Sequence, residues 1–329
     1  MEFGLSEEQQ ELASIVRSLL AKRADSAAVR ASSTSAEGYD TELWSTLVDQ
    51  VGAAALNIPE EYGGAGFSLF ESLVVLEEVG RSLAPSPLLS SLVASEALLA
   101  GGNTDAMERL LPRIAAGEVA SLVNGGNPAL DADRATVLLA VTPEALVEVD
   151  PATAAPQHVE TVDQTLRLGT ITLDGASTMP AGDAAAGVAR ANLVRFVGVA
   201  ALQAGLAARA VEMTVAYTKE RVQFGRGIGS FQALKHRMAD MLVLQEMSRS
   251  ASWSASYAVA TGADNAEYLA HVAKSYCSDA IDRIAAETVQ LHGGIAITWE
   301  HDAQLVFKRA HALSQLFGQA HDHRALIDL

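Results

Sequence analysis

Apolar residues recur at helical spacing through the first third of the chain. The first set falls at intervals of three and four and comprises Leu5, Leu12, Ile15, Val16, Leu19 and Leu20. This spacing predicts an amphipathic helix that begins at Ser6. Further helices are predicted near 43–51, 67–80, 88–100 and 107–116, with Pro- and Gly-rich loops between some of them. The pattern therefore indicates an N-terminal helical domain over residues 1–116.

The pattern changes after residue 116. Apolar runs become short, at 120–123, 135–141, 145–149 and 166–173, and the turns between them are rich in Asp, Pro, Gly and Thr. Short apolar runs separated by such turns are typical of β-strands. Residues 117–182 are too few for a large independent barrel. We therefore predict a reduced middle β domain.

Long helical patterns occupy residues 183–329. They cover 185–221, 231–260, 265–291 and 301–316, and each exceeds the average helix of globular proteins. Four long helices joined by short loops predict an antiparallel bundle. The expected fold is mainly α with a small β insert: an N-terminal helical domain, a reduced middle β domain and a C-terminal four-helix bundle.

The charge balance narrows the class of partner. The formal net charge is -17, and phosphate backbones or anionic membranes need clustered Lys and Arg instead. We expect neither nucleic acid nor membrane as a partner. Cys277 is the single cysteine, which excludes an internal disulfide. The N-terminus lacks the positive charge of a signal peptide, and we expect no apolar run to reach the length that a membrane span needs. We expect a cytoplasmic protein, and we predict no metal site.

The loop between the first two bundle helices carries the candidate chemistry. It reads ERVQFGRGIGSFQ, from Glu220 to Gln232. Arg221, Gln232 and the glycine-rich backbone offer donors to a phosphate, and Phe224 and Phe231 offer flat apolar faces. The alternative is a helix hairpin whose glycines serve turn geometry, with Arg221 in a surface ion pair. The loop alone does not decide between these two interpretations.

Three separated segments resemble one family in the same order along the chain. The loop, followed by ALKHRMADM, resembles the C-terminal domain of acyl-CoA dehydrogenases. The segment VQLHGGIAITWEH supplies the family's Gln, its two Gly and its downstream Glu as Gln290, Gly293, Gly294 and Glu300. LSEEQQELASIVRSLL, IPEEYGGAG and LEEVGRSLAPSPLLSS look like the N-terminal helical domain. The resemblance therefore covers essentially the whole chain.

The resemblance implies a flavin enzyme. In this family the loop and the later segment hold the ADP half of an FAD whose flavin sits mainly in the neighbouring subunit. The positions carried over are Arg221, Gln223, Phe224, Ile228, Gln232, Gln290, Gly293 and Gly294. The resemblance also implies an acyl-CoA substrate and an electron-transfer flavoprotein or a similar acceptor.

The family's catalytic base is missing. A Glu occupies one of two places in the family, and these fall on Phe317 or Gly318 in the last loop and on Arg195. None of these side chains can take up the substrate proton. We therefore assign no catalytic residue. Other acids lie nearby in sequence, at Glu300, Asp302 and Asp322. We interpret His321 and His323, beside Asp322, as part of a solvated tail rather than of a relocated base.

The middle domain departs from the family as well. Residues 121–134 stand where the family usually has a segment like Thr-Glu-Pro-Gly-x-Gly-Ser-Asp, and the later Trp-x-Ser/Thr stretch that lines the flavin in the family is not visible. Together the losses predict one subunit of a heteromeric acyl-CoA dehydrogenase, α2β2, whose partner supplies the base and the flavin pocket, as in bacterial enzymes that act on steroid-derived CoA thioesters. Two alternatives stay open: a self-sufficient homotetramer with a relocated base, and a non-catalytic scaffold. The small residues at 198–205 fit either a bulky acyl group or close helix packing.

Overall fold

The computed structural model describes residues 4–327 and divides the chain into two compact units. One unit contains Met1–Leu76 and Ala84–Arg195, and the other contains Glu77–Leu83 and Phe196–Leu329. Two helices, α4 (Leu69–Ser82) and α7 (Ala184–Glu220), contribute residues to both units. The predicted fold class, mainly α with a small β insert, is confirmed.

The first unit begins with helices that start where the sequence supplies a cap. Ser6 and Gln9 form a capping box at the first helix, and Asp25, Asp40 and Asn103 accept backbone N–H groups at later ones. The elements are α1 (Glu7–Arg23), α2 (Ser26–Ser33), α3 (Thr41–Thr46), η1 (Leu47–Val51), η2 (Glu60–Tyr62), the first part of α4, α5 (Leu88–Gly101) and α6 (Thr104–Ala115).

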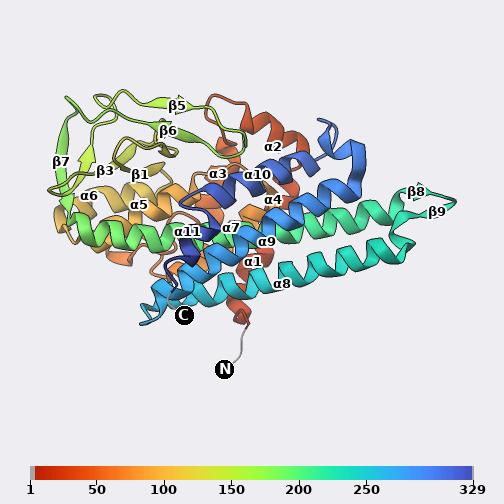
Figure 1. Ribbon diagram of the computed structural model, residues 1–329. Helices are drawn as coiled ribbons and strands as arrows, with labels where there is room; N and C mark the ends of the chain where they lie inside the picture. The colour runs from red at the N-terminus through yellow and green to blue at the C-terminus, as the bar shows by residue number, and fades with distance from the viewer. Residues whose placement is uncertain (1–3, 328–329) are drawn as a thin grey trace. The chain divides into compact units, whose positions relative to one another are not determined.

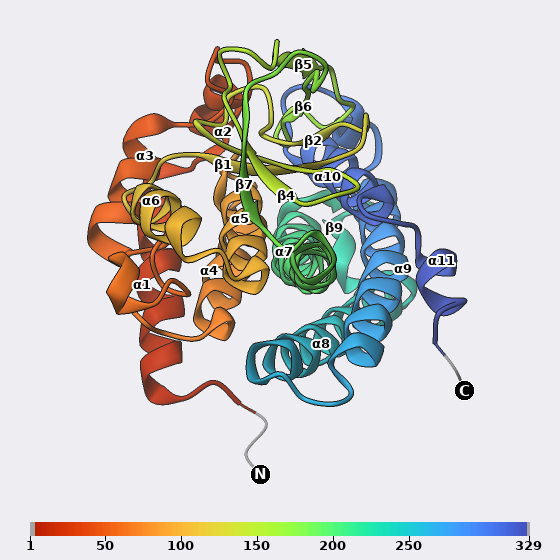
Figure 2. The ribbon, with the colours of Figure 1, turned by 90° about the vertical axis from the view of Figure 1, so that its left-hand side faces the viewer.

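Two small sheets follow these helices. One has the strand order β1-β3-β4-β7 and the other β2-β6-β5. β1 pairs parallel with β3, whereas β3–β4 and β4–β7 are antiparallel. α5 packs against β1, as Figures 1 and 2 show. The strands are β1 (Ala120–Asn124), β2 (Ala129–Leu130), β3 (Val137–Val141), β4 (Leu146–Val149), β5 (Gln157–Val159), β6 (Leu168–Thr170) and β7 (Thr178–Gly182).

Each of the four predicted apolar runs contains a strand, namely β1, β3, β4 and β6. The structure adds β2, β5 and β7, which the pattern did not predict. β2 has only two residues, and β5 and most of β7 lie at the surface, so none of them carries a long apolar run. Residues 125–126, which follow β1, form a simple turn.

The second unit is built on long helices. Besides the second part of α7, these are α8 (Gln232–Thr261), α9 (Ala266–His292), α10 (Ala303–Gln315) and the short α11 (Ala320–Arg324). α9 contacts α8, α10 and α11 (Figures 1 and 2). Buried hydrogen bonds join α7 to α9, from Gln203 Nε2 to Ser278 Oγ and from Thr214 Oγ1 to Thr288 Oγ1. α9 is therefore the central helix of this unit.

Glycines allow α7 to lie very close to the end of α4. A Cβ atom at Gly205 would meet the carbonyl oxygen of Glu77 at 1.8 Å, and one at Gly80 would meet that of Leu202 at 2.2 Å. Only glycine fits at such distances. Of the two interpretations of residues 198–205, close helix packing is the one that the structure supports at Gly205.

α7 also bears on the expectation that no apolar run is long enough to span a membrane. Its length and hydropathy are sufficient for a membrane span, contrary to our expectation that no apolar run is long enough. However, 78% of its most apolar window is buried inside the protein, as in the core helix of a folded domain. Cys277 on α9 is buried as well, in agreement with a packing role.

Candidate functional site

The loop between α7 and α8 is a tight β-hairpin at the far end of the two helices (Figure 1). β8 (Val222–Gln223) pairs with β9 (Arg226–Gly227), and Phe224 and Gly225 form the turn with φ of 53° and 75°. Two successive positive φ angles define a type I′ turn, whose twist matches that of the two strands. Phe is unusual at such a position, and this side chain is 91% exposed.

The remaining glycines of the loop bring its backbone against α7. A Cβ at Gly227 would meet the carbonyl oxygen of Lys219 at 3.0 Å, and one at Gly229 would meet that of Thr218 at 3.0 Å. The Ile228 N–H donates to the Arg221 carbonyl at 2.8 Å. These contacts fix the hairpin to the end of α7. The glycines therefore do serve the geometry of the turn, as one of the two interpretations of the loop predicted.

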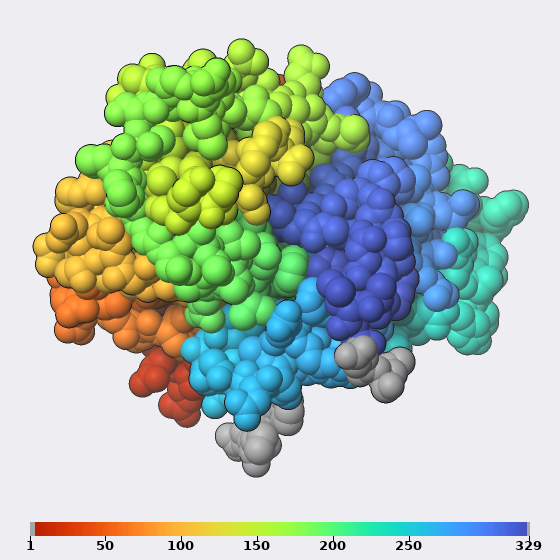
Figure 3. Space-filling model, turned by 60° about the vertical axis from the view of Figure 1, so that its left-hand side comes forward, coloured from red at the N-terminus to blue at the C-terminus, as the bar shows by residue number. Residues whose placement is uncertain are grey.

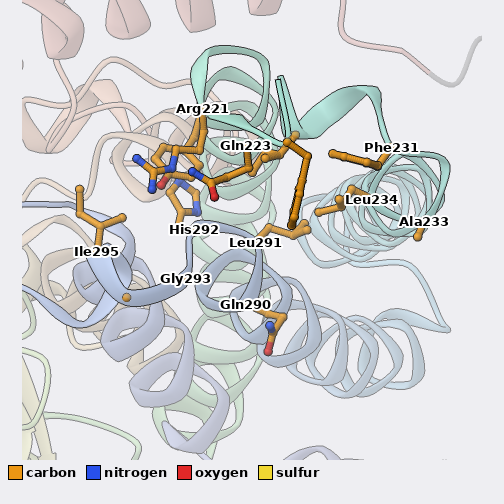
Figure 4. A pocket seen from close by; sticks show the side chains of 14 residues that line it. Arg221, Gln223, Phe231, Ala233, Leu234, Gln290, Leu291, His292, Gly293 and Ile295 are labelled. Atoms are coloured by element: carbon orange, nitrogen blue, oxygen red, sulfur yellow. The ribbon is translucent and has the colours of Figure 1, made fainter. Parts of the chain in front are cut away.

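The hairpin forms one wall of a pocket of about 770 Å³, and the other wall is the end of α9 with η4 (Gly293–Ile297). Seven of the eight predicted positions line this pocket: Arg221, Gln223, Phe224, Ile228, Gln290, Gly293 and Gly294. In Figure 4, Arg221 and Gln223 reach toward His292, whereas the Gln290 side chain points away from them. Gln232 does not line the pocket; it is the exposed first residue of α8.

The Arg221 guanidinium has no acidic partner. Within residues 4–327, no carboxylate lies within 4.0 Å of it, so the surface ion pair of the alternative interpretation is absent. By contrast, Arg237 on α8 pairs with Glu287 at 2.5 Å. Arg226 stacks over the Phe231 ring at 3.9 Å, which orders a cation beside the pocket.

Sequence reasoning missed two aromatic residues of the pocket, Tyr217 and His292. Their rings stack with centroids 4.4 Å apart. His292 donates from Nδ1 to the Thr288 carbonyl at 2.7 Å, so a neutral ring presents Nε2 as an acceptor. Burial is the main cause that lowers the pKa of His292, and Nε2 is buried without a hydrogen-bond partner. The available signals were spacing alone: Tyr217 is one helical turn before Arg221, and His292 directly precedes Gly293.

The pocket can bind a ligand, but its lining contains no Asp or Glu that could serve as the family's carboxylate base. It offers an unpaired guanidinium, glycine backbone, apolar rings and one acceptor nitrogen. Such a set suits a phosphate joined to a flat heterocycle. Among residues 4–327, no group of three His, Cys, Asp or Glu side chains could hold a metal ion.

The two usual positions of a base lie elsewhere. Phe317 and Gly318 form the loop between α10 and α11, with φ of 60° and 105°. Arg195 on α7 belongs to the first unit and is 9% exposed. Its guanidinium donates to Asn192 Oδ1 at 3.0 Å and to the Leu122 carbonyl at 3.2 Å. Burial lowers the pKa of Arg195 to about 10, so it remains a cation that ties α7 to β1.

The neighbouring acids already have contacts or lie at the surface. Glu300 is exposed, and Asp302 faces Arg209 at 3.5 Å. Asp322 accepts the Gln319 N–H at 2.9 Å and so caps α11. None of the three lines the pocket.

One interpretation of the last segment was wrong. His321 is exposed, as expected of a solvated tail, but His323 is only 3% exposed and hydrogen-bonded on both ring nitrogens. Its burial depends on α9, far away in the sequence, which a local pattern cannot indicate.

Comparison with known proteins shows which family has this architecture. The acyl-CoA dehydrogenase N-terminal domain model matches residues 6–118, and the acyl-CoA dehydrogenase C-terminal domain model matches residues 189–328. The chain is 44% identical to the acyl-CoA dehydrogenase IpdE2 of Mycolicibacterium smegmatis, over 95% of this chain and 96% of the relative.

Two solved structures of related complexes superpose closely. The Tcur3481-Tcur3483 steroid ACAD G363A variant has a TM-score of 0.88 and 28% identity, over 98% of this chain and 96% of the other. The ChsE4-ChsE5 complex from Mycobacterium tuberculosis has a TM-score of 0.89 and 25% identity, over 99% and 98%. The protein is therefore a member of the acyl-CoA dehydrogenase family of oxidoreductases.

Proposed function

We propose that this chain is one subunit of an FAD-dependent heteromeric acyl-CoA dehydrogenase and holds the ADP half of a flavin whose ring lies in a partner subunit. The observation that carries the proposal is an intact binding pocket in a chain that has no carboxylate at either base position. A self-sufficient enzyme needs both the binding pocket and a carboxylate base. A subunit that completes its partner's site needs only the binding pocket.

The residues of the pocket fit the ADP group. Arg221 offers a planar fork of donors for the pyrophosphate. Phe224, Ile228 and Phe231 offer apolar contact for the adenine. His292 Nε2 is an acceptor that no protein group satisfies, and ADP carries amino and hydroxyl donors. The backbone at Gly293 and Gly294 allows close approach because neither residue carries a side chain. Gln232 contributes through its position beside the loop, if its side chain turns toward the ligand.

The partner must supply what this chain lacks. A bound flavin would supply the acceptor for the hydride that leaves the β carbon of the acyl-CoA. The α-proton needs a carboxylate from the partner chain, because Phe317, Gly318 and Arg195 cannot accept it. The structures named above are complexes of paired chains, and one is described as a steroid enzyme. We therefore propose an α2β2 assembly that oxidises a bulky, steroid-derived acyl-CoA in the cytoplasm and passes electrons to an electron-transfer flavoprotein or a similar acceptor.

The domain boundaries belong to the same proposal. We expect an N-terminal helical domain at 1–116, a reduced β domain at 117–182 and a helix bundle at 183–329.

The test is the flavin content of the chain alone and with a partner. We expect the purified chain to be colourless and inactive. Co-expression with a full-length acyl-CoA dehydrogenase encoded beside it should give a stable complex with one FAD for every two chains. Purification of the single chain with one FAD and dehydrogenase activity would overturn the proposal and favour the homotetramer, in which replacement of Glu300, Asp302 or Asp322 by Ala should abolish turnover.

A further inference from the structure

The loop between α10 and α11 is where the family places its base, and its backbone is held in an unusual conformation. Both Phe317 and Gly318 have positive φ, at 60° and 105°. Phe317 is a bulky residue in a region that only glycine adopts readily, so surrounding contacts must hold it there. Two sets of contacts within the second unit do so, one from His323 and one from Lys274.

His323 fills the space beneath the loop. Its Nε2 lies 3.1 Å from the Phe317 carbonyl, and because a carbonyl only accepts, Nε2 carries the proton. In a neutral ring Nδ1 is then an acceptor, and it lies 2.8 Å from His271 Nδ1, which must donate. The Phe196 ring packs on both imidazoles, at 4.6 Å from His323 and 5.0 Å from His271. Burial is the main cause that lowers the pKa of His323 to about 4, so the ring is neutral at pH 7, as this arrangement requires.

Lys274 holds the loop from α9. This side chain is fully buried, at 0% exposure. Its Nζ donates to the Gly318 carbonyl at 2.7 Å, the Ser314 carbonyl at 3.3 Å and Ser278 Oγ at 3.0 Å. All three ammonium protons are therefore used. Beyond the loop, Ser275 Oγ donates to the Ala320 carbonyl at 3.0 Å, which fixes the start of α11 as well.

No side chain can be added where the base would stand. A Cβ at Gly318 would meet His323 Nε2 at 2.9 Å, and the φ of Gly318 is strained for any other residue. His323 is itself wedged between Phe196, His271 and the loop, so it has little room to move. The His323 side chain thus fills the space that a side chain at residue 318 would need.

We propose that residues 314–324 form a closed cap in which the His323 side chain occupies the space at the former base position, so that an acid restored at Gly318 could not rebuild a catalytic site in this chain. In Figure 3 this dark-blue carboxyl-terminal segment lies on the surface beside the light-blue start of α9. The inference rests on the proposed function for its second part. It goes further, because it states that the site of this chain cannot be restored by returning the missing acid.

The first test replaces Gly318 by Glu and compares it with Gln319→Glu, which places the same charge on the adjacent exposed residue. We expect Gly318→Glu to lower Tm by roughly 5 °C or more and Gln319→Glu to change it little. In the Gly318→Glu background, His323→Ala should cost much less Tm than it does alone, because it removes the clash. A Gly318→Glu protein as stable as the wild type would overturn the cap.

The second test measures the tautomers of the two histidines. Nitrogen NMR of the labelled chain should show neutral His323 protonated on Nε2 and neutral His271 protonated on Nδ1 between about pH 5.5 and 8. Rapid tautomer exchange with an ordinary pKa would overturn the cap. These histidine and Tm results need no partner, so they stand even if the proposed function fails.

Discussion

Two loops of the second unit, one between α7 and α8 and one between α10 and α11, differ in how their polar groups are paired. The α7–α8 hairpin leaves the Arg221 guanidinium without a carboxylate and His292 Nε2 without any partner. The α10–α11 loop uses its carbonyls internally, with the Phe317 carbonyl on His323 and the Gly318 carbonyl on Lys274. One loop has unused hydrogen-bonding capacity beside a pocket, and the other has its capacity filled by α9 and α11.

The two loops of this helix bundle therefore have different kinds of role: polar groups left unpaired suit ligand binding, and polar groups paired internally stabilise the fold. Buried or oriented polar groups cost stability when they lack partners, so a protein keeps them mainly where a ligand supplies the partner. Groups that are fully paired inside the fold stabilise it and leave nothing for a ligand. Under the proposed function, the chain retains one ligand-binding loop of the family, whereas the other loop has a structural role. Four predictions test this contrast.

Replacement of Arg221 by Ala should have the largest effect. The complex with the partner should retain at least about 10-fold less FAD, because a charged hydrogen bond to phosphate contributes roughly 1.5–3 kcal/mol. The flavin absorbance per chain after gel filtration measures this. Arg237→Ala is the matched control, since Arg237 is on the same helix hairpin but already pairs with Glu287. Full flavin content in the Arg221→Ala complex would favour the scaffold interpretation instead.

Replacement of Lys274 by Met should destabilise the chain without touching the flavin pocket. Two carbonyls and a hydroxyl lose their donor, while the cost of burying the ammonium is relieved. We expect a net loss of about 2 kcal/mol in the free energy of unfolding, measured by urea titration. Lys235→Met, at an exposed position of α8, should leave the midpoint nearly unchanged. Equal stability of the two variants would show that Lys274 does not hold the loop.

The stability of the chain should fall as pH drops from 6.5 toward 4. The folded-state pKa of His323 is about 4, below its ordinary value of 6.5, mainly through burial. The unfolded chain therefore binds this proton first, and acid shifts the equilibrium toward unfolding. The full effect is at most about 3 kcal/mol. His323→Gln should flatten this part of the profile, and an unchanged slope would exclude His323 as its source.

The smallest effect is expected from Phe224→Asn. Asn tolerates positive φ, and Asn-Gly is the favoured sequence of a type I′ turn. The isolated chain should gain up to about 1 kcal/mol of stability in thermal unfolding. If the Phe224 ring contacts the adenine, flavin retention in the complex should fall at the same time. A stability gain with unchanged flavin content would exclude Phe224 from the binding set.

Much of the fold could be predicted from the sequence because its signals are local. The cap at Ser6 and the long apolar patterns of α7 to α10 each depend on residues close together in the chain. The pocket was also largely predictable, because the hairpin and the Gly293–Gly294 segment carry recognisable motifs. The resemblance implies that these segments hold the ADP group, which is part of the proposal, and the structure brings them together around one cavity.

The rest depends on contacts between distant segments. The burial of His323 results from His271 and Phe196, more than fifty residues away along the chain. The exclusion of Gln232 from the pocket depends on the rotation of α8 at its first residue, which spacing within the loop does not determine. Tyr217 and His292 meet because α7 and α9 cross there, and neither carries a motif of its own. Each of these features is set by helix packing rather than by a local pattern.

The hairpin tip also has a practical consequence for anyone who handles this chain. Phe224 stands 91% exposed at the end of a two-residue turn, with Arg221 and Arg226 on either side. In an unassembled chain these three side chains are sites for chymotrypsin and trypsin at a protruding loop tip, where proteolytic nicking concentrates. Cleavage at this one place would separate α7 from α8 and leave the rest of the fold intact. Limited proteolysis at the hairpin would therefore report whether the proposed partner covers it.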